Sequence, residues 1–337
     1  MIVDTGFVWR SVSVGDAEAM ADLNAAVREA DGVGDIRSAT EMAAVFKDDG
    51  RPVPPAFFGV FAGECLAALG ALVARRRPAP EHRMQFWGMV HPDFRRRGLG
   101  TELVSLAIRE APELHARTTF SHSPLELAMD LYDDVPGHSQ LAADTGFEIW
   151  RSSYEMIRDL PWDPADLSGP LSGSATGRLD DGLEIVGFDQ RYVDELRDAH
   201  IAAFVLDHPG ATCPTPELWR RRFTNATFRP DLSCFVRDRQ THTIAGYLLA
   251  NHSEEDAWAS GKRDVHLMTI ATRREYRRRG VAGSLIHTAL TEAVKQGFDT
   301  ASLDVDAENP TGAVRVYERA GFRVLHKCSA YIRKICA

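Results

Sequence analysis

The sequence lacks the long apolar runs, paired cysteines and basic excess that mark several classes of protein. No stretch of about 18 apolar residues occurs, which excludes a membrane-spanning helix, and residues 1–10 lack the pattern of a signal peptide. The five cysteines include no Cys-x-x-Cys pair, so neither a zinc site nor a redox motif is indicated. Lys and Arg number 39 against 48 Asp and Glu, and this net charge of -9 does not favour nucleic-acid binding. We expect a cytoplasmic protein with reduced thiols and with neither membrane nor nucleic acid as a partner.

Length and an internal repeat predict two domains. A chain of 337 residues fits two domains of about 100–200 residues each. Segment 91–100 ends in Arg-Arg-Arg-Gly-Leu-Gly and segment 273–282 in Arg-Arg-Arg-Gly-Val-Ala, and a Gly-Phe pair follows each of them. Residues 159–182 are rich in Pro, Gly, Ser and Asp and have no apolar period, so we expect a linker there. The expected domains are residues 7–158 and 183–337.

The hydrophobic pattern around the second repeat predicts alternating strands and helices. Residues 265–270 are typical of a strand, 281–296 of a helix, 301–305 of a strand and 313–319 of a short helix. Strand alternation places Val265, Leu267 and Thr269 on one face and His266, Met268 and Ile270 on the other.

The first repeat has a similar order of elements. We expect a strand at 85–90, a helix at 101–111 that stops before Pro112, and a strand at 118–121. Strands that alternate with helices in this way predict a mixed α/β sheet.

The Arg-x-x-Gly-x-Gly/Ala segments are suited to binding a diphosphate. A strand that turns into a helix through small residues presents backbone N–H groups at the positive end of the helix dipole. Gly280 and Ala282 keep side chains away from such a ligand. The arginines around them, Arg273, Arg274, Arg277, Arg278 and Arg279, can meet further phosphate charge.

A second pattern follows this loop. Asn309, Ala313, Tyr317 and Gly321 stand at intervals of four, so Ala313 and Tyr317 share one face of a helix. Together with the loop that begins at Arg277, this pattern closely resembles the GNAT superfamily of acetyl-coenzyme A-dependent N-acetyltransferases. The resemblance is specific in the second repeat and partial in the first. It implies two tandem GNAT-like domains, each with a mixed, mostly antiparallel central sheet flanked by helices.

The resemblance also implies roles for individual residues. Tyr317 matches the tyrosine that protonates the departing thiolate, a role that suits a phenol with a pKa near 10. Binding of acetyl-CoA, as co-substrate, is implied for the strand, the loop and one asparagine: Met268, Thr269, Ile270, Arg277, Arg278, Arg279, Gly280, Val281, Ala282, Gly283 and Asn309.

The general base is expected on the strand that precedes the loop. GNAT enzymes with a carboxylate base commonly carry it eleven positions before the loop motif, which here is His266. An imidazole can deprotonate an ammonium group near neutral pH, although a histidine at a sheet surface can also be without catalytic function. Asp264 and Asp304 are the alternative bases.

Three acidic residues, Asp304, Asp306 and Glu308, alternate close to this motif. They resemble a calcium loop only superficially, because Asn309 stands where that turn needs glycine. We expect no metal and interpret these residues as an acidic rim that attracts a cationic amine.

The first repeat retains the loop but not the acid–base residues. Arg95, Gly98 and Gly100 match the loop motif, and we expect them to bind the cofactor. Ala142 stands at the position of Tyr317, Asp134 at that of Asn309 and Met84 at that of His266. We therefore expect the second domain to catalyse, and the first to be structural or to hold coenzyme A without turnover.

The leading hypothesis is acetyl transfer from acetyl-CoA to the primary amine of a small molecule, by a monomer or homodimer. The tandem arrangement resembles that of the mycothiol synthases, which acetylate the cysteinyl amine of a sugar-linked thiol precursor, although that resemblance would place a glutamate at position 266. A non-catalytic acyl-CoA sensor or scaffold is a second alternative. Nucleic-acid binding through residues 75–77 is opposed by the net charge. We expect residues 207–210 on the acceptor side, with Trp219 more in keeping with a core position than with a ligand contact.

Overall fold

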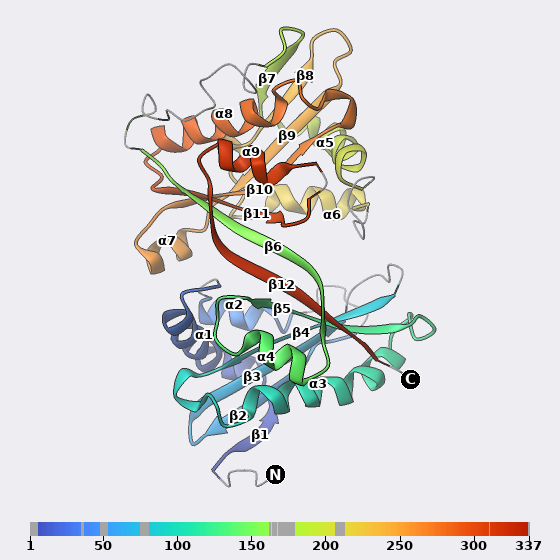
Figure 1. The fold of residues 1–337 in the computed structure, drawn as a ribbon, viewed down its shortest axis with the longest axis vertical. Helices are drawn as coiled ribbons and strands as arrows, with labels where there is room; N and C mark the ends of the chain where they lie inside the picture. Colours follow the sequence, from blue (N-terminus) through green and yellow to red (C-terminus); the bar gives the residue numbers. More distant parts are fainter. Residues whose placement is uncertain are drawn as a thin grey trace. The chain divides into compact units, whose positions relative to one another are not determined.

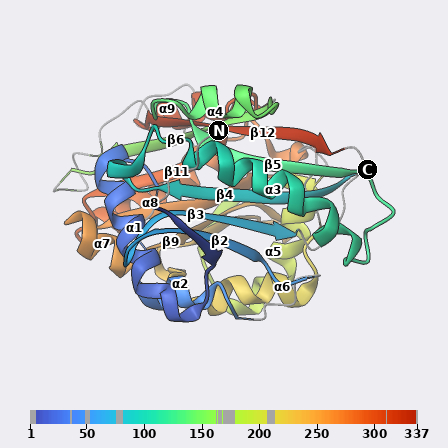
Figure 2. The ribbon, with the colours of Figure 1, turned by 90° about the horizontal axis from the view of Figure 1, so that it is seen from below.

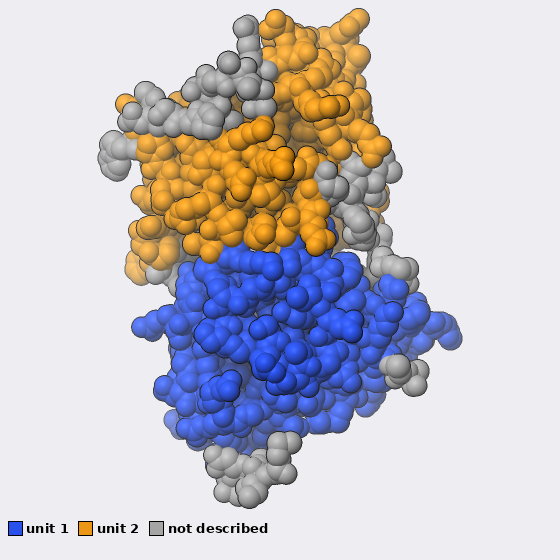
Figure 3. Space-filling view, in the orientation of Figure 1, with its two compact units in different colours: residues 1–152, 326–337 blue, residues 153–325 orange. Residues whose placement is uncertain are grey.

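The chain forms two compact units in a computed structural model that describes residues 6–34, 37–47, 53–74, 81–161, 163, 167, 179–205, 213–309 and 311–335. Unit 1 comprises residues 1–152 and 326–337, and unit 2 comprises residues 153–325 (Figure 3). Among the helices of these described ranges, none is long and apolar enough to cross a membrane.

Unit 1 is a mixed sheet with helices on both faces (Figure 2). Its strand order is β1-β2-β3-β4-β5-β12, and all neighbouring pairs are antiparallel except β4 and β5. Helix α3 packs on one face, and helices α1 and α2 lie on the other. The elements are β1 (Val8–Ser11), α1 (Ala17–Asp31), α2 (Ala39–Ala44), β2 (Ala56–Ala62), β3 (Cys65–Ala74), β4 (His82–Val90), α3 (Leu99–Ala116), β5 (Leu125–Tyr132), α4 (His138–Asp144), the first part of β6 (Glu148–Asp159) and most of β12 (Arg323–Ile335).

Unit 2 repeats this plan. Its strand order is β7-β8-β9-β10-β11-β6, and β10 and β11 are its one parallel pair among the described strands. Helices α8 and α9 cover one face, and α5 and α6 cover the other (Figure 1). The elements are β7 (Leu183–Gly187), α5 (Val193–His200), α6 (Pro216–Arg221), β8 (Cys234–Asp238), β9 (Ile244–Asn251), α7 (Glu254–Ser260), β10 (Asp264–Thr272), α8 (Val281–Lys295), β11 (Thr300–Asp306) and α9 (Ala313–Arg319), together with the second part of β6 and the start of β12.

These two units confirm the predicted fold class of a mixed, mostly antiparallel sheet flanked by helices. They differ from the contiguous segments 7–158 and 183–337 in the last strand of each repeat. The second half of β6, from residue 153, pairs with β11 in unit 2, and residues 328–335 of β12 pair with β5 in unit 1. Each repeat therefore gives its final strand to the sheet of the other, a pairing that local sequence patterns do not encode.

Two predictions for the first repeat were wrong. Helix α3 does not stop before Pro112 but continues to Ala116, because Ala111 and Leu114 remain buried on its apolar face and stabilise the last turns. Residues 118–121 form turns, and the strand begins at Leu125 instead.

Candidate active site

Strands β10 and β11 of unit 2 separate partway along their length. Their parallel pairing joins Asp264 to Thr300, Val265 to Ala301 and His266 to Ser302, and no further pair follows. Both strands nevertheless continue, β10 to Thr272 and β11 to Asp306. The two strands therefore diverge beyond His266.

A β-bulge lies in β10 where the divergence begins. His266 pairs with Asn251 and Thr269 with Leu249, so three steps along β10 face two along β9. One extra residue interrupts the ladder, and such an insertion leaves part of the backbone unpaired and reverses the alternation of side chains. The backbone of Met268 and Thr269 is therefore a place where an N–H group can be directed at a ligand rather than at β9.

The bulge corrects the predicted faces of β10. Thr269 pairs with Leu249 and shares the face of the core under α5 and α6 with His266, whereas Ile270 packs against the core under α8 with Val265. The prediction that Ile270 shares a face with His266 was wrong, because strict alternation does not hold across an inserted residue.

The predicted diphosphate loop joins β10 to α8. Arg278 has φ 61° and Gly280 has φ 78°, so two left-handed residues turn the chain before the helix begins at Val281. The Ser284 N–H closes the first intrahelical bond at 3.0 Å to the Gly280 carbonyl. The N–H groups of Val281, Ala282 and Gly283 precede it and have no acceptor within the helix, so they are available to an anion.

Unit 1 has the same backbone at the same point. Arg96 has φ 61°, Gly98 has φ 82°, and α3 begins at Leu99. The first intrahelical bond, from the Glu102 N–H to the Gly98 carbonyl, is again 3.0 Å long. The loop geometry is therefore present in both units. The bulge is not, because β4 pairs with β3 in continuous register.

Several of the loop arginines bind protein groups rather than pointing to an open site. Arg279 lies 3.1 Å from Asp180, and its hydrogen bond lowers the pKa of that exposed carboxyl group. Arg95 makes two hydrogen bonds, of 2.6 and 2.8 Å, to the carboxylate of Asp31. Arg277 donates to the Thr272 carbonyl at 3.4 Å. An anion at these loops would therefore be held mainly by main-chain N–H groups.

The His266 side chain belongs to a polar row on one face of the sheet. Its Nδ1 lies 3.1 Å from Ser302 Oγ, and its Nε2 lies 3.8 Å from the carboxylate of Asp304. The Ser302 hydroxyl also donates to Asp264, whose other oxygen accepts from Thr300 at 2.7 Å. The imidazole is 37% exposed, so the ring is partly accessible from solvent.

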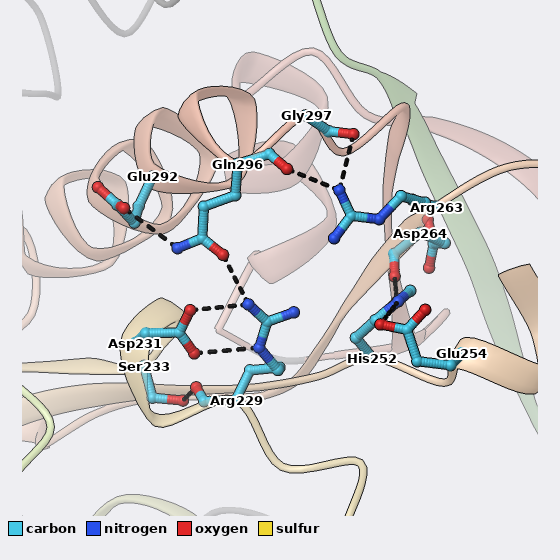
Figure 4. Close-up of polar contacts among 10 residues, drawn as sticks. All are labelled: Arg229, Asp231, Ser233, His252, Glu254, Arg263, Asp264, Glu292, Gln296 and Gly297. Carbon is cyan, nitrogen blue, oxygen red and sulfur yellow. Dashed lines mark hydrogen bonds and ion pairs between the residues drawn. The ribbon is translucent and has the colours of Figure 1, made fainter.

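The backbone at the start of β10 is fixed by a second set of contacts (Figure 4). His252 Nδ1 donates to the Asp264 carbonyl at 2.7 Å, and His252 Nε2 lies 3.3 Å from Glu254. Arg263 donates to the carbonyls of Gln296 and Gly297, at 2.6 and 3.2 Å, where α8 ends. These contacts hold Asp264 in place next to the polar row.

Tyr317 lies on α9 and is buried in the core between α8 and the sheet. Burial raises the pKa of its phenol to about 12, so the hydroxyl keeps its proton throughout the physiological range. The Phe322 N–H donates to the Tyr317 carbonyl at 3.0 Å, and in unit 1 the Phe147 N–H donates to Ala142 at 2.9 Å. This shared contact shows that Ala142, fully buried, stands at the position of Tyr317.

The segment between β11 and α9 is held by its own polar side chains. Asn309 Oδ1 accepts hydrogen bonds from the N–H and hydroxyl of Thr311, at 2.9 and 2.5 Å, so a cofactor contact of Asn309 would use its amide nitrogen. The Asp306 carboxylate accepts from the Glu308 N–H at 3.0 Å. Within the described residues no group of three His, Cys, Asp or Glu side chains is placed to hold a metal ion.

The counterpart of His266 in unit 1 is Gln85 rather than Met84. Gln85 is the last residue of the parallel β4–β5 pairing, as His266 is of β10–β11, and it donates to Asp130 at 3.1 Å. Met84 is fully buried in the core under α3. The bulge adds one residue to β10, so His266 lies eleven positions before its loop motif. The same spacing in unit 1, where β4 has no bulge, leads to Met84 instead of Gln85.

Other polar positions of unit 1 also differ from their counterparts in unit 2. Arg83 and Glu126 occupy the places of Asp264 and Thr300 and form a buried ion pair at 2.6 Å. Asp134, predicted as the counterpart of Asn309, accepts from His326 Nδ1 at 2.6 Å, which lowers the pKa of its carboxyl group.

The sequence reasoning missed Ser302, Thr300 and Asn251. Residues 300–306 alternate between polar and apolar side chains, a readable signal that β11 has one polar face. Asn251 pairs with His266 across the sheet and donates to the Met268 sulfur at 3.4 Å, while its buried Oδ1 has no hydrogen-bond partner among the described groups.

The structure describes only some of the residues predicted to bind the acceptor or nucleic acid. Residues 207–210 and 75–77 lie outside the described residues. Trp219 is fully buried and donates its indole N–H to the Val193 carbonyl at 2.7 Å, which confirms it as a core residue.

Comparisons with known proteins agree with this geometry. The sequence matches the acetyltransferase (GNAT) family over residues 23–133 and 193–322. It is 27% identical over 308 residues to a mycothiol acetyltransferase of Thermobispora bispora, with 91% of this chain and 92% of the relative covered. It is 27% identical over 340 residues to one of a Parafrankia species, with 95% of each chain covered.

Two solved structures share the fold. A GCN5-related N-acetyltransferase from Sphaerobacter thermophilus has a TM-score of 0.77 at 24% identity, with 99% of this chain and 98% of that chain covered. A tandem GNAT protein from the clavulanic acid biosynthesis pathway has a TM-score of 0.72 at 14% identity, with 98% of this chain and 99% of that chain covered.

Proposed function

Because the chain belongs to the acetyltransferase (GNAT) family, we propose that unit 2 transfers the acetyl group of acetyl-CoA to the primary amine of a small molecule. The observation that carries this proposal is the coincidence of three features in unit 2: diverging strands, a bulge at the divergence, and a titratable side chain beside them. Unit 1 has the divergence and the loop but neither the bulge nor the histidine. We assign unit 1 a structural or cofactor-holding role without turnover.

Different residues of unit 2 have different roles in the proposed reaction. The N–H groups from Val281 to Gly283 bind the diphosphate of the co-substrate, and the left-handed Gly280 lets that diphosphate approach. A backbone N–H at the bulge, at Met268 or Thr269, stabilises the negative charge that develops on the thioester oxygen. His266 takes the proton of the amine, and Tyr317 gives a proton to the leaving sulfur.

The overall reaction releases one proton. The acceptor arrives as an ammonium ion and loses one proton to His266, which frees the nitrogen lone pair. A C–N bond then forms and the C–S bond breaks, while the sulfur takes the phenolic proton of Tyr317. The surplus proton on the new amide nitrogen restores Tyr317, and His266 passes its proton to solvent. The carboxylate of Asp304, 3.8 Å from His266, attracts the ammonium group to this side of the sheet.

The first acceptor to test is the cysteinyl amine of a sugar-linked thiol. The relatives named mycothiol acetyltransferase, which match almost the full length of the chain, support this choice. Simple primary amines and amino sugars form the comparison panel.

The test incubates the full chain with acetyl-CoA and each amine, and measures the acetylated product by mass spectrometry. We expect His266→Gln and Tyr317→Phe each to lower kcat by about 10²–10⁴-fold, the usual contribution of one acid or base. The control is Gln85→Ala in unit 1, which replaces the counterpart of His266 and should leave kcat unchanged. Loss of activity in the control with retention in His266→Gln would assign catalysis to unit 1 and refute the proposal.

A further inference from the structure

We infer that Ser302 and Asp264 are positioning residues that hold the His266 ring with its proton on Nδ1, so that Nε2 faces the acceptor as the base. The catalytic part of this inference rests on the proposed function. The tautomer itself does not, because it follows from hydrogen bonds within unit 2.

The position of each hydrogen follows from what each group can donate. An ionised Asp264 carboxylate only accepts, and the hydrogen of the Ser302 hydroxyl is directed to it. Ser302 Oγ has no second hydrogen, so towards His266 Nδ1, 3.1 Å away, it can only accept. Nδ1 must therefore carry a hydrogen. In the neutral ring Nε2 then has the free lone pair, which is the state that a general base needs.

Asp264 is held so that it cannot easily turn away from Ser302. Its second oxygen accepts from Thr300 at 2.7 Å, and its backbone carbonyl accepts from His252 at 2.7 Å. The direction of the Ser302 hydroxyl is therefore set by a carboxylate that is fixed through both its side chain and its main chain.

The other groups around His266 leave Nε2 as the edge that meets the acceptor. On β9 its cross-strand partner Asn251 is neutral. On β11 Asp304 lies 3.8 Å from Nε2, and Glu155 of β6 pairs with Asp304. From α5, His200 is engaged with the Tyr247 hydroxyl at 2.6 Å. The charged groups on the Nε2 side are thus acidic and favour a cationic amine there.

Unit 1 shows that the fold does not require this arrangement. The counterpart of Ser302 there is Ala128, which has no hydroxyl, and the counterpart of Asp264 is the cation Arg83. The relay of carboxylate, hydroxyl and imidazole is therefore found in the unit that also has Tyr317.

The direct test is the tautomer of His266 in the full chain labelled with 15N-histidine. Long-range 1H–15N spectra distinguish the two ring nitrogens, and the signal missing from His266→Gln identifies the residue. We expect an unprotonated Nε2 in the neutral ring of the native protein. In Ser302→Ala we expect loss of this preference. A native ring protonated on Nε2 would overturn the inference.

The kinetic test compares Ser302→Ala with the conservative Ser302→Thr. We expect the alanine variant to lose about 10–100-fold in kcat, the factor of one hydrogen bond to a charged group, with the KM for acetyl-CoA unchanged. The threonine variant keeps the hydroxyl and should recover kcat to within about threefold. The matched control is Ser329→Ala, which removes a buried strand hydroxyl that bonds Ser152 at 3.0 Å in unit 1 and should leave kcat unchanged.

The outcomes separate this inference from the proposed function. A tautomer with protonated Nδ1 in a protein that acetylates no amine supports the relay and refutes the function. Acetylation that depends on His266, together with native-like kcat and pH profile in Ser302→Ala, refutes the relay and keeps the function. Equal losses in Ser302→Ala and Ser302→Thr would also overturn it, because a merely steric role predicts that result.

Discussion

A methyl group added at Gly246 should disturb the diphosphate loop more than the rest of the fold. Gly246 lies in β9, between the end of β10 and the start of α8. A Cβ there would stand 2.6 Å from the Ala271 carbonyl oxygen, 2.7 Å from Val281 Cγ1 and 3.3 Å from Thr272 Cα. Ordinary contacts begin at 3.4 Å, so the backbone of β10 or the first residue of α8 must move by about 0.8 Å.

The size of the effect follows from that displacement. Overpacking of a buried site costs about 1–3 kcal/mol, and each kcal/mol lowers Tm by about 2–4 °C in a domain of this size. Val281 carries one of the N–H groups proposed to bind the diphosphate. A shift of about 0.8 Å takes that N–H out of hydrogen-bond range, and a bond to a charged acceptor is worth about 1.5–3 kcal/mol. The KM for acetyl-CoA should therefore rise by about 10–100-fold in Gly246→Ala.

The assay measures kcat and KM for acetyl-CoA at saturating acceptor, and Tm by scanning calorimetry. The matched control is Gly59→Ala in β2, where the added Cβ meets the side chains of Val12 and Phe61, at 2.5 and 2.8 Å. This control should lower Tm without raising the KM. A Gly246→Ala variant with a lowered Tm and a native KM would show that the start of α8 does not bind the co-substrate.

Two further predictions follow from burial. Burial raises the pKa of the Cys234 thiol to about 12, so at pH 8 an alkylating reagent should modify the exposed Cys65 well before Cys234. Peptide mass spectrometry measures the two alkylation rates, and equal rates would contradict this prediction. Because the pKa of Tyr317 is raised from 10 to about 12 in the folded chain, the unfolded state releases this proton first as pH rises. The free energy of unfolding should then fall by roughly 2 kcal/mol between pH 10 and 12 from this group alone. Urea titrations of Tyr317→Phe should show a smaller fall than those of the native chain, and equal slopes would contradict the prediction.

Local features of the site were predictable from the sequence because they depend on local backbone chemistry. The left-handed turn needs a glycine at its last position, so Gly98 and Gly280 are visible as a repeated pattern. Tyr317 was placed on a helix by its spacing from Asn309 and Gly321, and the structure has that helix at Ala313–Arg319.

The features that the sequence analysis missed or predicted wrongly depend on neighbours distant in sequence. The bulge in β10 arises from pairing with β9, and strict alternation along residues 265–270 cannot show it. The spacing of eleven positions between His266 and the loop includes this inserted residue. In unit 1, which lacks it, the same spacing leads to Met84 instead of Gln85. Strand exchange is equally hidden, because β6 and β12 have the same local pattern in either sheet. The alternating pattern of β11 shows that the strand has a polar face. It does not show that Ser302 lies next to His266, because that contact depends on the pairing of β10 with β11.

The proposed binding and acid–base roles place different demands on the chain. The role proposed for the loop depends on backbone N–H groups, and both units have that backbone. The proposed proton transfer needs particular side chains, and unit 1 has other residues at several of these positions.

Restoring a histidine alone in unit 1 should therefore not restore catalysis. In the double variant His266→Gln with Gln85→His, the new imidazole would adjoin Ala128, which has no hydroxyl, and its strand would carry Arg83 where unit 2 has Asp264. Arg83 is paired with Glu126 at 2.6 Å, so neither residue replaces the carboxylate of Asp264, and Ala142 offers no proton to the leaving sulfur. We expect the double variant to be as inactive as His266→Gln, measured by the same acetylation assay. Recovery of a tenth or more of native kcat would mean that a base and a phosphate-binding loop are sufficient, and that neither the relay nor Tyr317 is required.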